Sequence, residues 1–280
     1  MCTASANSST LRPSGFASLD SLAIYLALGA GAGLLAGLFG VGGGLIIVPV
    51  LAWAFTVQGM DAGVIMHLAV GTSLASIWLT SIMSIRAHHR RGAVAWPLVK
   101  QLAGGLLLGA FAGSLIADQL PTTALKRLFG GFELLVAAQM LLVSRYPPRF
   151  DLPGRAGMAA AGGLIGGVSA IIGIGGGTLS VPFLAACRVP MPQAVATAAA
   201  CGLPIAVTGA LGFMLTGWNA ANLPAWSSGY LYWPAWLGIV VASGLTAGLG
   251  ARLAHSLPAE RLRQGFAGLL AIIGLLMLAA

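Results

Sequence analysis

The chain has 280 residues, of which 58% are hydrophobic and only 7% are charged. Soluble domains carry roughly 25% charged residues, so this chain lacks the charge to cover an ordinary water-facing surface. The net charge of +8 does not indicate a nucleic-acid partner, because the basic residues lie between apolar runs, where membrane proteins collect them. Composition therefore predicts an all-α polytopic membrane protein with the lipid bilayer as its partner.

The predicted elements begin after a polar, Ser- and Thr-rich segment, residues 1–20, which we expect to be a disordered N-terminal tail. Apolar stretches then fill residues 21–144 and 157–280, and a cytoplasmic linker is expected over 145–156. In chain order the stretches are 22–38, 45–57, 63–85, 94–117, 124–143, 157–172, 178–187, 192–216, 231–253 and 261–279. About 20 apolar residues span a bilayer, so 45–57 and 178–187 are too short to cross alone. We expect about eight transmembrane helices by the conventional count.

The two apolar regions repeat one another. GVGGGLIIVP at 40–49 returns as GIGGGTLSVP at 173–182, and GSLIADQLPTTALKRLFGG at 113–131 aligns with GARLAHSLPAERLRQGFAG at 250–268. Each region also contains a WP doublet in an equivalent place. One unit of about 125 residues thus occurs twice in the same order, which is the usual plan of secondary transporters.

Two topologies compete. If each glycine motif only interrupts one spanning helix, the repeats run parallel and the basic residues divide eight against six between the two sides. If each motif is the tip of a hairpin that turns back, the repeats are inverted and the division is eleven against three, which accounts for all 14. Positive residues concentrate on the cytoplasmic side, so the count favours inverted repeats. The cytoplasmic set is then Arg86, Arg90, Arg91, Lys100, Arg145, Arg149, Arg155, Arg188, Arg252, Arg261 and Arg263.

The glycine motifs are the leading candidate for a substrate site. Glycine is a poor helix former, and non-helical backbone is tolerated in a membrane only where it lines a cavity or is buried in protein. Such breaks present backbone N–H groups at the start of a half-helix, where negative charge is favoured. The alternative is close helix packing, which suits Gly33, Gly37, Gly163 and Gly167. The predicted substrate-binding residues are Gly40, Gly42, Gly43, Gly44, Gly173, Gly175, Gly176, Gly177 and Thr178, with Pro49 and Pro182 as helix-breaking residues.

Three hydroxyl residues, Thr72, Ser73 and Thr197, lie in the helix after each hairpin. They are further candidates for contact with an anion, and the alternative is a hydrogen bond to the carbonyl four residues earlier in their own helix. Two ionisable residues inside apolar runs, Glu133 and His67, are candidates for proton coupling, because intramembrane ionisable groups are costly. For Glu133 the alternative is an ion pair with Lys126 or Arg127. For His67 it is a packing or interfacial role.

Nothing in the chain indicates a cofactor, a metal or an enzyme. The three cysteines Cys2, Cys187 and Cys201 form no CxxC pair. The run RAHHRRG at 86–92 lacks the additional ligands of a metal site and is better interpreted as a cytoplasmic topology anchor. No cluster of His, Cys, Asp and Glu falls within the apolar stretches, as an embedded enzyme or redox protein would need.

GLLAGLFGVGGGLIIVPVL at 33–51 and GLIGGVSAIIGIGGGTLSVPFL at 163–184 resemble the duplicated signature of the TauE/SafE family of sulfite exporters. The resemblance covers the chain from Leu22 onward. It implies a secondary transporter of small sulfur-containing anions, such as sulfite, thiosulfate or organosulfonates, in the bacterial inner membrane. A channel for small anionic or neutral solutes is the alternative, because paired half-helices suit a pore as well. The sequence does not determine the physiological anion, the direction of transport or the coupling ion. It also leaves open the oligomeric state, which includes a homo-oligomer.

Overall fold

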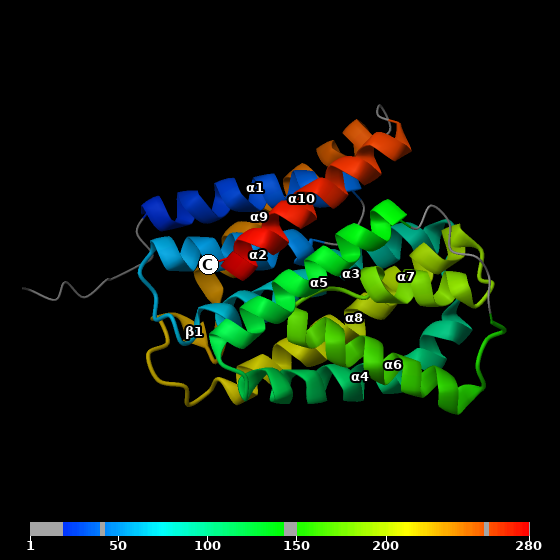
Figure 1. Ribbon diagram of the computed structural model, residues 1–280, viewed down its shortest axis with the longest axis horizontal. Coiled ribbons are helices and arrows are strands. Elements are labelled where there is room, and N and C mark those ends of the chain that lie inside the picture. Colours follow the sequence, from blue (N-terminus) through cyan, green and yellow to red (C-terminus); the bar gives the residue numbers. More distant parts are fainter. Residues whose placement is uncertain (1–18, 40–42, 143–149, 255–257, 280) are drawn as a thin grey trace, which may run out of the picture.

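The computed structural model describes residues 19–39, 43–142, 150–254 and 258–279. Over these residues it confirms an all-helical protein, to which one two-stranded hairpin is added (Figure 1). In chain order the elements are α1 (Leu19–Phe39), α2 (Gly44–Val57), α3 (Ile65–Arg90), α4 (Trp96–Asp118), α5 (Thr122–Leu142), α6 (Arg155–Ile172), α7 (Gly177–Ala186), α8 (Met191–Thr216), β1 (Ser227–Ser228), β2 (Leu231–Tyr232), α9 (Trp233–Ala254) and α10 (Ala259–Ala279).

Each helix coincides with one predicted apolar stretch. The boundaries differ most at the end of α3, where polar residues extend the helix beyond the predicted stretch to Arg90. Helix α1 begins at Leu19, inside the segment predicted as a tail, and the rest of that segment lies outside the described residues. Helix α6 begins at Arg155, inside the predicted linker, much of which is also outside them.

Local sequence explains several helix ends. Helices α4 and α8 carry proline in their first turn, where the missing N–H would have no intrahelical acceptor anyway. Helix α6 ends at Gly173, which adopts a left-handed conformation with φ of 79° and donates its backbone N–H to the carbonyl of Ser169. Glycine takes this conformation without the steric cost that a Cβ would add. The first glycine of the second motif therefore ends α6.

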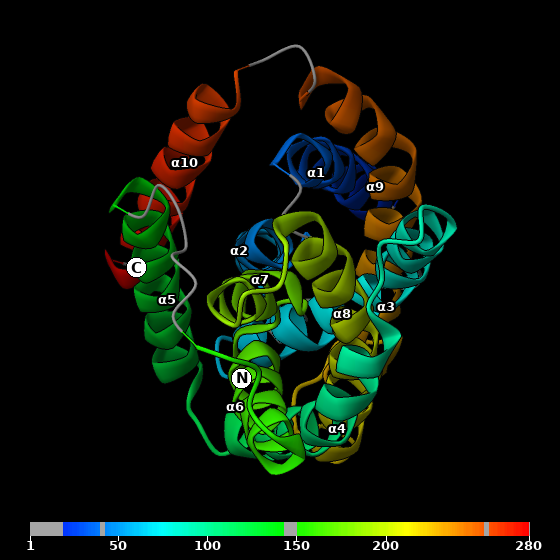
Figure 2. The same cartoon turned by 90° about the vertical axis from the view of Figure 1, so that its right-hand side faces the viewer.

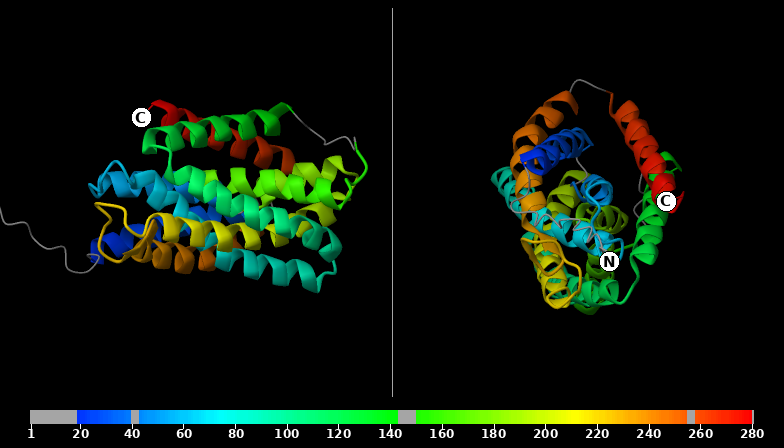
Figure 3. Two further views of the ribbon diagram at one scale, coloured as in Figure 1. Left: turned by 90° about the horizontal axis from the view of Figure 1, so that it is seen from below. Right: turned by 90° about the vertical axis from the view of Figure 1, so that its left-hand side faces the viewer.

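The long helices run roughly side by side in alternating directions. In Figure 1, α1, α3, α5 and α9 run from left to right, and α4, α6, α8 and α10 run from right to left. The left view of Figure 3 shows the described connections between consecutive long helices at the two ends of the bundle. The right-hand end of Figure 1 is called the basic end here, because it holds most of the described basic residues, namely Arg86, Arg90, Arg91, Lys100, Arg155, Arg188, Arg252, Arg261 and Arg263. The other end is called the aromatic end, after the connection 217–232 with its Trp218, Trp226, Tyr230 and Tyr232.

The two short helices, α2 and α7, lie in the middle of the bundle. Figure 2, seen from the basic end, shows them inside a ring formed by the other helices. Helix α2 runs from the middle towards the aromatic end, and α7 runs from the middle towards the basic end (Figure 1). Each therefore turns back from the helix before it, as the hairpin interpretation of the glycine motifs predicts.

The prolines do not mark the breaks. Pro49 lies inside α2 and Pro182 lies inside α7, and both helices continue through them. The prediction that these residues break the helix is therefore corrected. Each proline is the sixth residue of its helix, so it removes one intrahelical hydrogen bond, but its fixed φ is helical and the helix continues. The interruption falls on the glycines before each half-helix.

Small residues bring pairs of helices into close contact. On α4, Gly105 and Gly109 face Ala159 and Gly163 of α6 so closely that a Cβ on either would meet α6 backbone. Gly33 of α1 meets the backbone of Ser243 on α9 in the same way. The packing interpretation of Gly33 is thus confirmed. At the α4–α6 contact the close approach depends on Gly105 and Gly109 rather than on Gly163, where a Cβ would have room.

Six helices, α3, α4, α6, α8, α9 and α10, are long and apolar enough to cross a membrane. The apolar part of α1 and the whole of α2 and α7 are shorter. Helix α5 has 21 residues but carries Lys126, Arg127 and Glu133. The structure thus confirms several membrane spans, and the expected count of about eight stays a prediction.

Candidate functional site

The site is built from the starts of the two central half-helices. Helix α2 is preceded by Gly43 and α7 by Gly176, and neither N-cap residue makes a side-chain capping hydrogen bond. The first N–H groups of a helix lack the acceptors that later ones find within it, so both starts can offer backbone donors to a ligand. The two motifs touch each other: a Cβ on Gly44 would lie 2.7 Å from the carbonyl oxygen of Gly173. The start of α2 therefore packs against the connection that leads from α6 into α7, and both glycine motifs lie in the centre of the bundle.

A cavity of about 610 Å³ begins at these helix starts. Its wall combines segments of α1, α2, α3, α5, α7, α8 and α9. Towards the basic end the cavity reaches the partly exposed His88, near the end of α3. The lining residues are Ala32, Gly33, Ala36, Gly43, Ile47, Ile77, Thr80, Ser81, Met83, Ser84, His88, Val136, Gln139, Met140, Gly175, Gly176, Gly177, Thr178, Val181, Pro182, Met191, Val195, Ala198, Ala199, Gly202, Ser243, Gly244 and Ala247.

The chemistry of the cavity wall is polar but uncharged. Apart from the imidazole of His88, its polar side chains are hydroxyls and one amide, including those of Ser81, Thr178 and Gln139. No carboxylate, lysine or arginine is among the described lining residues. With no charged side chain in this wall, the backbone N–H groups at the helix starts are the positive partial charges that it offers to a ligand.

Three aromatic rings pack together at the aromatic end of the bundle. Tyr25 of α1, Phe55 of α2 and Tyr232 of β2 contact one another edge to face, with centroid distances of 5.8 to 6.3 Å. The Tyr25 hydroxyl donates a hydrogen bond of 2.6 Å to Oε1 of Gln58. All three rings are buried. The lining of the cavity reaches towards the basic end and includes none of these rings.

The predicted glycines fall on or next to this cavity. Gly43, Gly175, Gly176 and Gly177 line it together with Thr178 and Pro182. Gly44 and Gly173 lie directly behind the wall, where they pack against each other. Gly40 and Gly42 are outside the described residues. The structure therefore brings both motifs to one place, and anion binding by them stays a prediction.

The predicted hydroxyls have other partners. The Thr72 hydroxyl accepts a 3.1 Å hydrogen bond from the backbone N–H of Tyr232, and that of Thr197 accepts one of 3.1 Å from Ala95. The Ser73 hydroxyl donates to the carbonyl of Gly173 at 2.9 Å. None of the three lines the cavity, and none bonds its own helix. Thr72 and Thr197 instead anchor the backbone just before each WP doublet, a use that neither alternative had included.

The two ionisable candidates lie apart from each other. His67 is buried near the start of α3, where its Nε2 is 3.1 Å from the carbonyl of Ala117 and its ring packs on Tyr230 at 4.8 Å. This position matches the packing alternative. Glu133 is fully buried on α5, and its carboxyl has no hydrogen-bond partner among the described residues. The ion pair with Lys126 or Arg127 is not formed.

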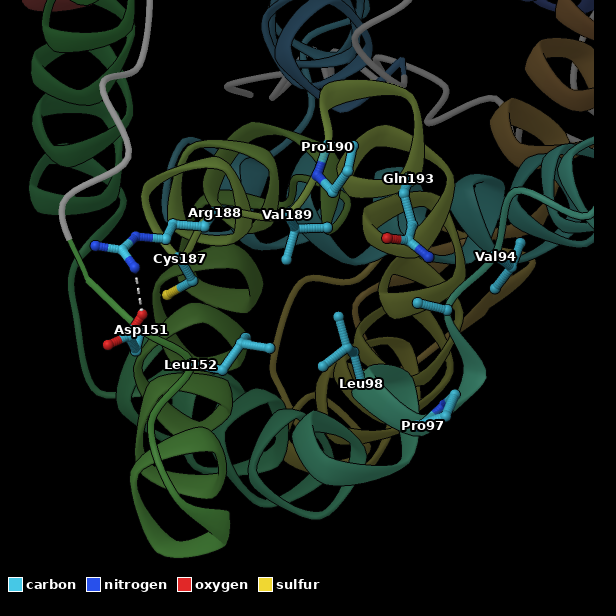
Figure 4. Close-up of a pocket in the computed structure, with 11 residues that line it drawn as sticks. Val94, Pro97, Leu98, Asp151, Leu152, Cys187, Arg188, Val189, Pro190 and Gln193 are labelled. Atoms are coloured by element: carbon cyan, nitrogen blue, oxygen red, sulfur yellow. Dashed lines mark hydrogen bonds and ion pairs between the residues drawn. The ribbon is translucent and has the colours of Figure 1, made fainter.

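A second hollow of about 690 Å³ lies at the basic end, between the starts of α4 and α8 and the end of α7. Figure 4 shows Leu98, Leu152 and Val189 pointing into it, while Arg188 extends away to Asp151. That ion pair is 2.8 Å long and exposed to solvent. None of the predicted site residues lines this hollow, so it is separate from the candidate site.

Sequence reasoning missed the part of the cavity wall that α3 supplies. Ile77, Ser81, Ser84 and His88 follow one another at helical spacing and all line the cavity. A polar stripe with this spacing on an apolar helix was the available signal. On α5, Gln139 was the corresponding signal, because it is polar within an otherwise apolar run.

Comparison with known proteins agrees with this architecture. Residues 25–277 match the sequence profile described as "Sulfite exporter TauE/SafE". The chain belongs to the TauE/SafE family. A Haemophilus influenzae protein described as "Probable membrane transporter protein" is 36% identical over 255 residues, which cover 91% of this chain and 97% of the relative. A Methanocaldococcus jannaschii protein with the same description is 29% identical over 92% of this chain and 95% of its own length. No solved structure matches the chain significantly.

Membership in the TauE/SafE family makes the chain a multi-pass membrane transporter. The profile spans both glycine motifs, the aromatic closure and the whole cavity wall. The cavity therefore lies within the part of the chain that matches the family.

Proposed function

We propose that the protein is a secondary transporter that carries small sulfur-containing anions, such as sulfite, thiosulfate or organosulfonates, across the bacterial inner membrane. The family description supports the substrate class. The observation that carries the proposal is the pair of uncapped helix starts at the closed end of an uncharged cavity. Free N–H groups and two helix dipoles favour an anion there without a fixed positive side chain.

In the proposed binding mode the anion lies against Gly175, Gly176 and Gly177. Its oxygens accept hydrogen bonds from backbone N–H groups at the start of α7 and from the hydroxyls of Thr178 and Ser81, which line the same cavity. A tetrahedral or pyramidal sulfur oxyanion offers several oxygens to such a cradle. Hydrogen bonds to a charged acceptor are roughly twice as strong as neutral ones, so a few of them replace the anion's hydration.

We also propose that the two halves are inverted repeats. Helices in equivalent places of the halves run in opposite directions (Figure 1). The contacts between helices correspond as well. Helix α1 packs on α9, and their equivalents α6 and α4 pack on each other. Helix α3 packs on its equivalent α8, and α5 packs on its equivalent α10. This arrangement supports a site at the repeat interface with alternating access to its two sides.

The basic end would then face the cytoplasm, following the positive-inside rule. In this proposal the cavity opens to that side, and the packed rings of Tyr25, Phe55 and Tyr232 close the passage at the other. A passage shut at one end favours a carrier over the alternative, a permanently open channel. The family description favours export, although a secondary carrier moves its substrate along whichever gradients are present.

The test is transport by the purified full-length chain in liposomes. Uptake of ³⁵S-labelled sulfite, thiosulfate and taurine is measured into vesicles with and without the same unlabelled compound inside, with chloride as a comparison anion. A carrier for sulfur anions gives uptake of at least one of them that internal substrate accelerates. No movement of any sulfur anion would reject the substrate class, and uptake indifferent to internal substrate would favour the channel.

A further inference from the structure

Glu133 is an acidic side chain halfway along a membrane helix. It is the twelfth of the 21 residues of α5, so at 1.5 Å per residue it lies roughly 16 Å from the start of the helix and a similar distance from its end. Its exposed fraction is 0%, and neither carboxyl oxygen has a hydrogen-bond partner among the described residues. An isolated carboxylate is strongly disfavoured in such a place, whereas the neutral acid is tolerated.

No charge on the helices around α5 compensates Glu133. Helix α5 packs against α10, α3 and α6, and the ionisable residues of these helices lie towards their ends. On α5 itself, Lys126 and Arg127 are about two turns away and form no ion pair with Glu133. The ionisable residues of the neighbouring helices are His67, Arg86, His88, His89 and Arg90 on α3, Arg155 on α6, and Glu260, Arg261 and Arg263 on α10.

The carboxyl group is close to the proposed substrate cavity along the helix. Val136, Gln139 and Met140 of α5 line that cavity. Residues three and seven positions apart share one face of a helix, so Glu133 continues the face of Val136 and Met140 by one more turn. It lies just beyond the closed end of the cavity, on the side of the aromatic end.

We propose that Glu133 is the proton-binding site that couples anion transport to proton movement. This inference rests on the proposed function. In the described conformation the carboxyl group is sealed and holds one proton. When the halves rearrange and water reaches it from the aromatic end, the carboxylic acid releases that proton to water on that side and becomes a carboxylate. Once the halves have returned, the carboxylate takes up one proton from water at the basic end and is then sealed again. One proton thus moves in each transport cycle.

Transport in liposomes tests the coupling. Vesicles with the full-length chain receive ³⁵S-thiosulfate, whose charge is constant over the pH range used, while K⁺ and valinomycin hold the membrane potential at zero. With one coupled proton, a gradient of one pH unit drives about tenfold accumulation. Glu133→Gln should lose this accumulation and keep exchange of labelled for unlabelled thiosulfate, and Glu133→Asp should restore part of it. Glu260→Gln, the same change at an exposed acid, should behave as the wild type.

Infrared spectroscopy of the reconstituted protein gives a readout that does not depend on transport. The wild type at pH 7 should show the carbonyl band of a protonated carboxylic acid, and Glu133→Gln should lack it. A wild type without this band, or a variant that keeps it, overturns the proton site. Full gradient-driven accumulation by Glu133→Gln overturns the coupling while leaving the proposed function intact. If the wild type moves no sulfur anion at all, the substrate proposal fails and the infrared comparison alone decides the role of Glu133. If Glu133→Gln does not fold, Glu133→Asp and the wild-type band carry the test.

Discussion

At the scale of single residues, the candidate site uses backbone rather than charged side chains. The glycines around it differ in what surrounds them. Gly176 is packed against the backbone of α8, so a Cβ there would meet the amide nitrogen of Gly202 at 2.7 Å, whereas Gly177 faces open space within the cavity. A side chain at 176 would disturb the fold, and one at 177 would enter the cavity.

Gly177→Val therefore tests the site without a steric clash. The added side chain should occupy the space proposed for the anion and weaken binding by at least roughly tenfold, which is about 1.4 kcal/mol. The measurement is the concentration dependence of uptake in liposomes. Gly104→Val on α4, where a side chain also meets nothing within 4 Å, is the matched control and should transport normally. Normal affinity in Gly177→Val would place the substrate elsewhere.

Ser73 holds the second glycine motif in position. Its hydroxyl donates to the carbonyl of Gly173, so Ser73→Ala leaves a buried acceptor unpaired and should cost about 1–3 kcal/mol of stability. Ser76→Ala is the matched control, because the Ser76 hydroxyl only returns to the carbonyl of Thr72 in its own helix. Thermal unfolding in detergent can be followed with a thiol-reactive dye that labels the buried Cys187 and Cys201. Equal midpoints for the two variants would contradict this role.

At the scale of elements, close helix contacts depend on missing side chains. The α4–α6 pair is held by the approach of Gly105 and Gly109 to Ala159 and Gly163. Without hydrophobic driving force between helices in lipid, van der Waals contact of this kind is a main source of association.

Gly109→Leu should force α4 and α6 apart, because the new side chain meets the backbone of Gly163. Overpacking of this kind typically costs about 1–3 kcal/mol, and the yield of folded protein on size-exclusion chromatography should fall with it. Gly104→Leu, one turn away on the exposed face of the same helix, should be tolerated. Equal yields would show that the α4–α6 contact does not limit stability.

At the scale of the whole molecule, the distribution of charge predicts orientation. The described basic residues concentrate at the end of the bundle towards which the cavity opens. In this orientation the conformation described here takes substrate from the cytoplasm.

Single cysteines in a cysteine-free background test that orientation. Thr123→Cys lies at the aromatic end and Ala87→Cys at the basic end, and both positions are exposed. An impermeant thiol reagent added to intact cells should label Thr123→Cys and should reach Ala87→Cys only after the membrane is opened. The reverse pattern would invert the assignment of the two ends, and labelling of both from outside would contradict the hairpin topology.

Much of this architecture could be read from local patterns. Apolar length located every helix, and the density of glycine located both interruptions, because these properties act within a few residues along the chain. Local patterns did not predict the hydrogen-bond partners of the hydroxyl groups. Thr72 and Thr197 were predicted to contact substrate or their own helix. They instead accept hydrogen bonds from backbone N–H groups more than 100 positions away. Their partners depend on which helices become neighbours.

The sequence by itself determined that this is a membrane-embedded helical protein of two similar halves, each broken by glycine, because hydropathy and backbone propensity are properties of short segments. Only the tertiary structure decided that the two breaks meet, that Ser81, Gln139 and Thr178 face one cavity, and that Glu133 is left without the ion pair that its neighbours in sequence could have supplied. Those results follow from helix packing, where contacts between backbones far apart in the chain select which side chains share a space.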